Sequence, residues 1–164
     1  MIESKPVIVG GVEFRLRVLE NWRLPIGIDH TVVPMAVTMT NRKRSPIRVP
    51  LLETFSTFLR SPSGFEFRTL STRDSVPNLA LFTELIDPGQ TCSVDLSGNV
   101  QGEANGMFRV VGLDGAGGTW YIANLVPGAY SVKLQIDARA KSGEMSEFDW
   151  TGKVQTVPVQ IQLL

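Results

Sequence analysis

The sequence predicts an all-β protein, an antiparallel sandwich in a single domain spanning residues 1–164. Three observations lead to this fold class. Apolar residues recur at every second position in short stretches, as in strands with one buried and one solvated face. Turn-forming residues separate these stretches. No regular alternation of strands with helical patterns is present, which disfavours parallel α/β folds.

The clearest strand begins after Pro127 and Gly128, a turn pair in which proline presets φ and glycine accepts a positive φ. Polar residues alternate strictly with apolar or aromatic ones from here to Asp137. The apolar members share one face, and they are Tyr130, Val132, Leu134 and Ile136. This pattern predicts a strand with one face in the core, around which the rest of the chain is organised.

Weaker forms of the same pattern predict the other strands. In chain order these are 12–18, 33–39, 65–68, 91–96, 107–113, 119–124 and 157–163, with short apolar pieces at 47–50 and 79–86. The last strand is expected to pair with 129–137, and 65–68 to form a hairpin with the segment before it.

Residues 51–59 fit two structures. Their apolar members have helical spacing, and these are Leu51, Leu52, Phe55, Phe58 and Leu59. Threonine and phenylalanine favour strands, however, and the neighbouring segments are all predicted strands. We favour a strand and keep the helix as the alternative.

Polar, glycine-rich and proline-rich segments predict the connections. A loop or irregular edge is expected at 21–30, a charged turn at 41–46, a loop at 69–78, a flexible loop at 97–106, a hairpin turn at 114–118 and a polar loop at 138–147.

Composition narrows the function classes. Sixteen basic and sixteen acidic residues give a net charge of zero, which disfavours nucleic-acid binding. No apolar run is long enough for a membrane span. One cysteine and no recognisable signal peptide favour a cytoplasmic location. Near-neutral charge also makes self-association easier, so we keep a homo-oligomer open.

Catalytic, metal and cofactor motifs are weak. His30 has no nucleophile elbow to serve, and Cys92 shares a face with Val94 and Leu96, as a buried thiol would. The acidic residues between Asp137 and Asp149 lack calcium-loop spacing. The glycine-rich segment 114–118 lacks the lysine of a phosphate-binding loop. We expect neither an enzyme nor a cofactor.

Aromatic residues are the better binding candidates, namely Trp22, Trp120, Tyr121 and Trp150. Trp120 and Tyr121 are adjacent on a predicted strand, so they point to opposite faces. At most one of them is central to the core, and the other lies at an edge or is available to a partner.

Several motifs resemble bacterial immunoglobulin-like sandwiches. These are Leu125-x-Pro-Gly-x-Tyr-x-Val132, Trp150–Val154 before a valine-rich last strand, Val37–Asn41 before a charged turn, and Asp87–Gln90. Together with Gly112–Trp120, the chain is similar to uncharacterised cyanobacterial proteins and, more loosely, to the intracellular proteinase inhibitors of bacilli. The resemblance implies an immunoglobulin-like β-sandwich of about seven to nine strands with Greek-key connections.

Three functions are therefore considered. The first is a non-enzymatic module that binds another protein through an exposed aromatic near 120–121 and through two loops, 69–78 with Arg73 and Val76, and 97–106 with Asn99 and Asn105. The second is an intracellular protease inhibitor that uses loop 69–78. The third is a carbohydrate-binding module that uses Trp22, Trp120 or Trp150.

Overall fold

The computed structural model describes residues 1–51, 54–72, 83–138 and 146–164, except the side chains of 70–72. The described residues form β-strands and turns without a helix, so the prediction of an all-β, antiparallel protein is confirmed. One short pair, between β4 (Asn21–Trp22) and β18 (Val159–Leu163), runs parallel. Within the described part there is no helix long and apolar enough to cross a membrane.

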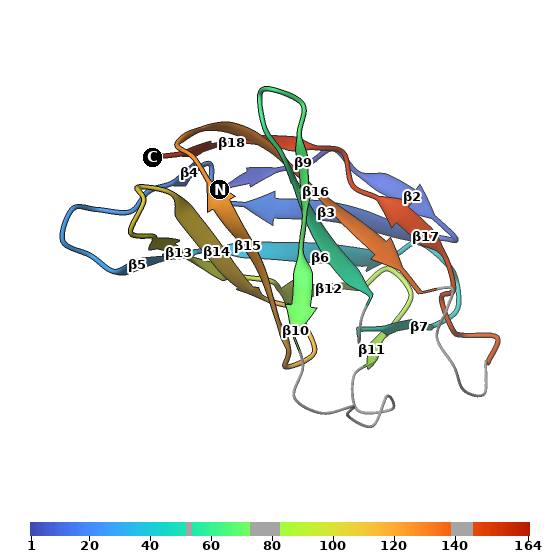
Figure 1. The fold of residues 1–164 in the computed structure, drawn as a ribbon. Helices are drawn as coiled ribbons and strands as arrows, with labels where there is room; N and C mark the ends of the chain where they lie inside the picture. The colour runs from blue at the N-terminus through green and yellow to red at the C-terminus, as the bar shows by residue number, and fades with distance from the viewer. Residues whose placement is uncertain (52–53, 73–82, 139–145) are drawn as a thin grey trace.

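Three sheets carry the fold, which Figure 1 shows as a ribbon. Sheet A contains β1 (Ile2–Glu3), β2 (Val7–Val9), β3 (Val12–Val18), β6 (Met35–Asn41) and β12 (Thr91–Asp95). Sheet B contains β4 (Asn21–Trp22), β18 (Val159–Leu163), β16 (Gly128–Asp137), β8 (Phe55–Arg60), β9 (Glu66–Arg68) and β17 (Lys153–Gln155). Sheet C has the order β10 (Leu70–Thr72), β15 (Thr119–Leu125), β14 (Phe108–Leu113), β13 (Gly98–Gly102) and β5 (His30–Val33). A separate pair joins β7 (Ile47–Pro50) to β11 (Thr83–Ile86).

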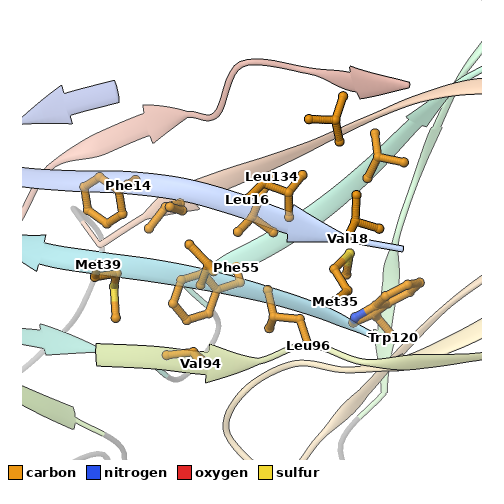
Figure 2. Close-up of a cluster of buried hydrophobic side chains, with 14 of the residues drawn as sticks. Phe14, Leu16, Val18, Met35, Met39, Phe55, Val94, Leu96, Trp120 and Leu134 are labelled. Atoms are coloured by element: carbon orange, nitrogen blue, oxygen red, sulfur yellow. The ribbon is translucent and has the colours of Figure 1, made fainter. Parts of the chain in front are cut away.

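Sheets A and B face each other across the main core. Inward side chains of β3 and β6, such as Phe14, Leu16 and Met39, meet Phe55 and Leu134 of sheet B (Figure 2). The alternation that predicted β16 is retained, because its apolar residues are buried and the residues between them are half-buried. The last strand, β18, pairs with β16 as predicted.

Sheet C continues sheet A without a change of register. The pairing of Ala36 with Asp95 in sheet A is followed by that of Val33 with Gly98 in sheet C. Between them, the Leu96 N–H donates to the Met35 carbonyl (2.9 Å). The β5–β6 and β12–β13 segments are therefore two long, bent strands shared by both sheets.

The described residues contain eighteen strand segments, more than the seven to nine predicted. Bends divide long strands, as at Pro34 between β5 and β6 and at Thr69 between β9 and β10. Short closing pieces such as β1 and β4 add to the count. The immunoglobulin-like arrangement and Greek-key connections stay predictions.

The ambiguous segment 51–59 forms a strand from Phe55 onward, as favoured, and residues 52–53 lie outside the described part. The helical spacing was misleading because Phe58 does not face the core. Its ring lies on the outer face of sheet B, beneath the Lys133 ammonium (5.2 Å) and the Arg68 guanidinium (5.8 Å).

The prediction of a flexible loop at 97–106 is wrong for its first half, because residues 98–102 form β13. This strand is paired on both sides, with β14 and β5. The first residue of β13, Gly98, packs closely against β14, since a Cβ at this position would lie 2.9 Å from the Val111 carbonyl oxygen. Strands also occupy parts of two other predicted loops. Asn21–Trp22 form β4 and His30 begins β5 at the two ends of 21–30, and residues 70–72 form β10.

Replacing Leu134 with alanine tests the core of sheet B. Leu134 is fully buried, so Leu134→Ala is expected to lower the free energy of unfolding by about 2–5 kcal/mol, as measured by urea denaturation. The neighbouring Gln135→Ala is the control, since Gln135 is half-buried on the outer face, and a change within about 0.5 kcal/mol is expected. Equal losses for the two variants would contradict the assigned faces.

Candidate functional site

The three tryptophans proposed as binding residues are buried, so their predicted role on the surface is corrected. Trp22, Trp120 and Trp150 are 1%, 3% and 4% exposed. Each indole N–H donates to a backbone carbonyl, of Leu19 (2.8 Å), Leu113 (2.7 Å) and Val9 (3.0 Å) respectively. A ring held in this way has no free face on which a sugar could stack. The carbohydrate-binding alternative thus loses its three tryptophans.

The opposed directions of Trp120 and Tyr121 are confirmed. The Trp120 indole lies against Gly112 of the neighbouring strand, at a position that any Cβ on this residue would occupy. Tyr121 points to the other face of sheet C and is half-buried. The absence of a side chain at Gly112 therefore allows the indole to lie against β14, on the inner face of the sheet.

Tyr121 belongs to a row of outward side chains that crosses four strands of sheet C. It pairs with Val111, which pairs with Asn99, which in turn pairs with Val32. Neighbours along each strand, such as Val33, Val100, Val110 and Trp120, are buried. The row therefore lies on the outer face of sheet C, and it contains two of the residues predicted from sequence, Tyr121 and Asn99.

Further apolar groups are exposed beside this row or in the loop before its edge strand. Leu113 is exposed two residues beyond Val111, and Val32 is 60% exposed at the edge strand. Ile26 and Ile28 are exposed on the loop between β4 and β5, which projects from the molecule in Figure 1. We use the name "sheet C face" for Val32, Asn99, Val111, Leu113 and Tyr121.

The other predicted binding residues are not part of this face. Asn105 is exposed in the turn between β13 and β14, where its side-chain oxygen accepts a hydrogen bond from the Met107 N–H (3.1 Å). Arg73 and Val76 lie outside the described residues. The protease-inhibitor alternative, which depends on loop 69–78, therefore stays a prediction.

Sequence reasoning missed Val32, Val111 and Leu113, although a signal for two of them was present. Val32-Val33 and Val110-Val111 are adjacent apolar pairs, like Trp120-Tyr121. In a strand, one member of such a pair must face outward. Three pairs of this kind lie in three strands of the same sheet, which indicates that its outer face is partly apolar.

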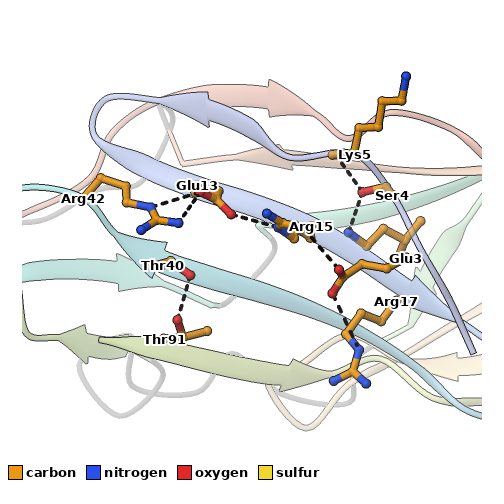
Figure 3. Close-up of polar contacts among 10 residues, drawn as sticks. Glu3, Ser4, Lys5, Glu13, Arg15, Arg17, Thr40, Arg42 and Thr91 are labelled. Atoms are coloured by element: carbon orange, nitrogen blue, oxygen red, sulfur yellow. Dashed lines mark hydrogen bonds and ion pairs between the residues drawn. The ribbon is translucent and has the colours of Figure 1, made fainter. Parts of the chain in front are cut away.

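The outer face of sheet A has a different character. The Glu13 carboxylate is buried between two guanidinium groups, of Arg15 (2.8 Å) and Arg42 (2.6 Å), and Glu3 also contacts Arg15 (3.2 Å; Figure 3). Hydrogen bonds from Arg15 and Arg42 lower the pKa of Glu13. These charges are already paired with one another, so this face offers a partner little uncompensated charge.

Two aspartates that could take part in ligand binding, Asp114 and Asp149, already interact with other groups of the protein. The Asp114 carboxylate accepts hydrogen bonds from the N–H groups of Ala116 (2.9 Å) and Gly118 (2.8 Å), so these amides of the glycine-rich turn bind its own aspartate. Asp149 is paired with Arg48 (3.0 Å). Within the described ranges, no group of three His, Cys, Asp or Glu residues could hold a metal ion.

Comparisons with known proteins identify no family and no function for the chain. No family model and no curated protein sequence matches the chain, so neither the cyanobacterial-type proteins nor the proteinase inhibitors are supported as relatives. Among solved structures, the chain is similar to an uncharacterised β-sandwich protein from Clostridium difficile 630. The TM-score is 0.33 and the identity 9%, over 67% of this chain and 83% of that one.

The buried Glu13 predicts a specific pH dependence. Its pKa is lower in the folded protein than the ordinary 4.5, so its stabilising contribution is complete above that value and is lost as the pH falls through the folded pKa. Urea denaturation at several pH values should therefore show wild type more stable than Glu13→Gln at neutral pH, with the difference shrinking in acid. A difference that stays constant with pH would contradict this role.

Cys92 is expected to be unreactive. Burial, with a smaller effect of Glu84, raises the pKa of its thiol to about 11. At pH 8 the thiolate fraction is then on the order of a hundredfold below that of a free cysteine. Alkylation by iodoacetamide should be slower in the native protein by about that factor, and unfolding in urea should restore the normal rate. Equal rates in both states would show that the thiol is accessible and unperturbed.

Proposed function

We propose that this chain is a non-enzymatic β-sandwich module, acting in the cytoplasm, that binds another protein through the sheet C face. The observation that supports this proposal most directly is the row Val32, Asn99, Val111 and Tyr121, which places apolar and aromatic groups on an outward surface. Outward faces of antiparallel sheets are ordinarily polar, and clustered apolar groups are typical of interaction sites.

The contrast with the other two sheets strengthens the proposal. The outer face of sheet A holds paired charges around Glu13. The outer face of sheet B is mainly polar, as shown by Ser131, Lys133 and Gln135 along β16. Its one large aromatic group, Phe58, lies beneath two cations. The outward row of sheet C instead combines two valines with Tyr121, which lies at the β15 end of the row beside Val111.

The side chains of the sheet C face suit a protein partner better than a charged ligand. A tyrosine provides a large contact area together with a hydroxyl, and tyrosines are enriched at the centres of protein interfaces. Asn99 beside Val111 adds hydrogen-bonding groups within the same row. Arg109, two residues before Val111 on β14, already donates to Gln101 (2.7 Å).

The test compares three baits in quantitative affinity capture. Wild type and Gln160→Arg, a matched control on the outer face of sheet B, are expected to retain the same partner. Tyr121→Arg places the same charged side chain in the sheet C face and is expected to reduce capture at least tenfold, because it would bury an unpaired charge in the interface.

Melting temperatures check that all three baits are folded, and a change of only a few degrees is expected for substitutions on outer faces. Partners captured equally by wild type and Tyr121→Arg, or no partner for any folded bait, would overturn the proposal.

A further inference from the structure

The edge of sheet C has an opening created by the path of β3. In sheet A, β3 runs beside β6 as far as Val18, which pairs with Met35. One residue later, the Leu19 N–H donates to the Pro34 carbonyl (3.0 Å). The chain then leaves for sheet B, where the Glu20 carbonyl accepts from the Gln162 N–H (2.8 Å). The long β5–β6 strand thus has β3 beside it up to Pro34 only.

The backbone groups exposed by this departure can be identified. In a β-ladder, successive residues direct their N–H and C=O groups to opposite edges. Since the Pro34 carbonyl points toward β3, His30 and Val32 point their backbone groups to the same edge, and Thr31 and Val33 point theirs to β13. Among the described residues, β5 pairs with β13 and with no other strand.

This edge is accessible from solvent. His30 is exposed, Val32 is 60% exposed, and Ile28 lies exposed just before the strand. Edge strands of this kind are ordinarily protected by charge, a bulge or a covering segment. Here β5 contains no Asp, Glu, Lys or Arg residue.

We propose that this edge pairs with the same edge of a second copy of the chain. The spacing of the unpaired backbone groups makes the edge self-complementary. If the two edges run antiparallel about a two-fold axis at Thr31, His30 of each copy lies opposite Val32 of the other. Both are hydrogen-bonded positions, so the two donors and two acceptors of each copy are all satisfied.

Two further observations favour a second copy as the occupant. The net charge of zero means that two copies do not repel each other strongly. Exposed apolar side chains also accompany the edge, at Ile28 and Val32, and a second copy would cover Val32. The dimer would join two five-stranded C sheets into one continuous sheet.

The first experiment is sedimentation equilibrium over a concentration series from about 10 μM to about 1 mM, a range suited to a short edge contact of modest affinity. Wild type is expected to shift from the mass of one chain to that of two. Val32→Pro removes an N–H that points to the open edge and is not bonded to β13. The variant should therefore remain folded, but its association should be weakened at least tenfold.

Val32→Thr is the matched control, because it keeps the shape of the side chain and both backbone groups. It should associate like wild type within about threefold. Thr31→Pro checks the assigned directions, since it removes an N–H that points to β13, and it should lower the melting temperature more than Val32→Pro does. Wild type that remains monomeric, or Val32→Pro that associates like wild type, would overturn the proposal.

A disulfide trap tests the register, in a background in which the only native cysteine is removed by Cys92→Ser. At the two-fold axis the Cα atoms of Thr31 and its copy would be about 4.5 Å apart, within disulfide range. Oxidised glutathione should therefore link Thr31→Cys chains into dimers, oxidising two thiols to one disulfide while it is itself reduced. The diagonal Val32→Cys pair, about 7–8 Å apart, should link poorly.

Failure of this dimer and failure of the proposed partner binding can be told apart. Tyr121→Arg leaves the backbone of β5 unchanged, so it should dimerise like wild type even where it loses the partner.

Discussion

The structure depends on the pairing of two long strands, which continues in one register from β6 and β12 into β5 and β13. Because its register does not change at Pro34, the alternation of inward and outward side chains continues through the bend, and Met35 and Val33 both reach the core. A slip by one residue would reverse every side chain beyond it. At the bend itself, the Met35 N–H donates to the Ser97 hydroxyl (3.3 Å), a side-chain contact that joins the two strands where the sheet changes direction.

This shared ladder explains why one core serves three sheets. Sheet C continues sheet A at one side and joins sheet B through Thr69 at the other, so its inner residues belong to the same buried cluster. Trp120 reaches that cluster because Gly112 leaves room for the indole. The same packing leaves Tyr121 outside, where it meets Val111 and the rest of the outward row. The packing of the interior therefore also determines the chemistry of the sheet C face.

The departure of β3 has a comparable effect on the edge. By crossing to sheet B after Leu19, the chain closes the sandwich with β4 beside β18, but no strand of the described ranges pairs with the other edge of β5. The sheet C face and the open edge thus both result from the long β5–β6 strand, which extends past the end of its neighbour β3. The protein-binding role and the self-pairing proposed above use these two surfaces separately, one through side chains and the other through backbone groups.

Two-residue periodicity in the sequence determined the strands, since alternation as in β16 predicts both a strand and its buried face. The opposite directions of Trp120 and Tyr121 follow from the same local rule. Tertiary structure alone decided that Asn99 lies in a strand, because a segment rich in glycine and asparagine becomes β-structure only when β14 and β5 pair with both its sides. It also decided that all three tryptophans are buried and that β5 keeps an open edge. These outcomes depend on contacts between residues far apart in the chain, and local periodicity carries no information about which distant strands meet.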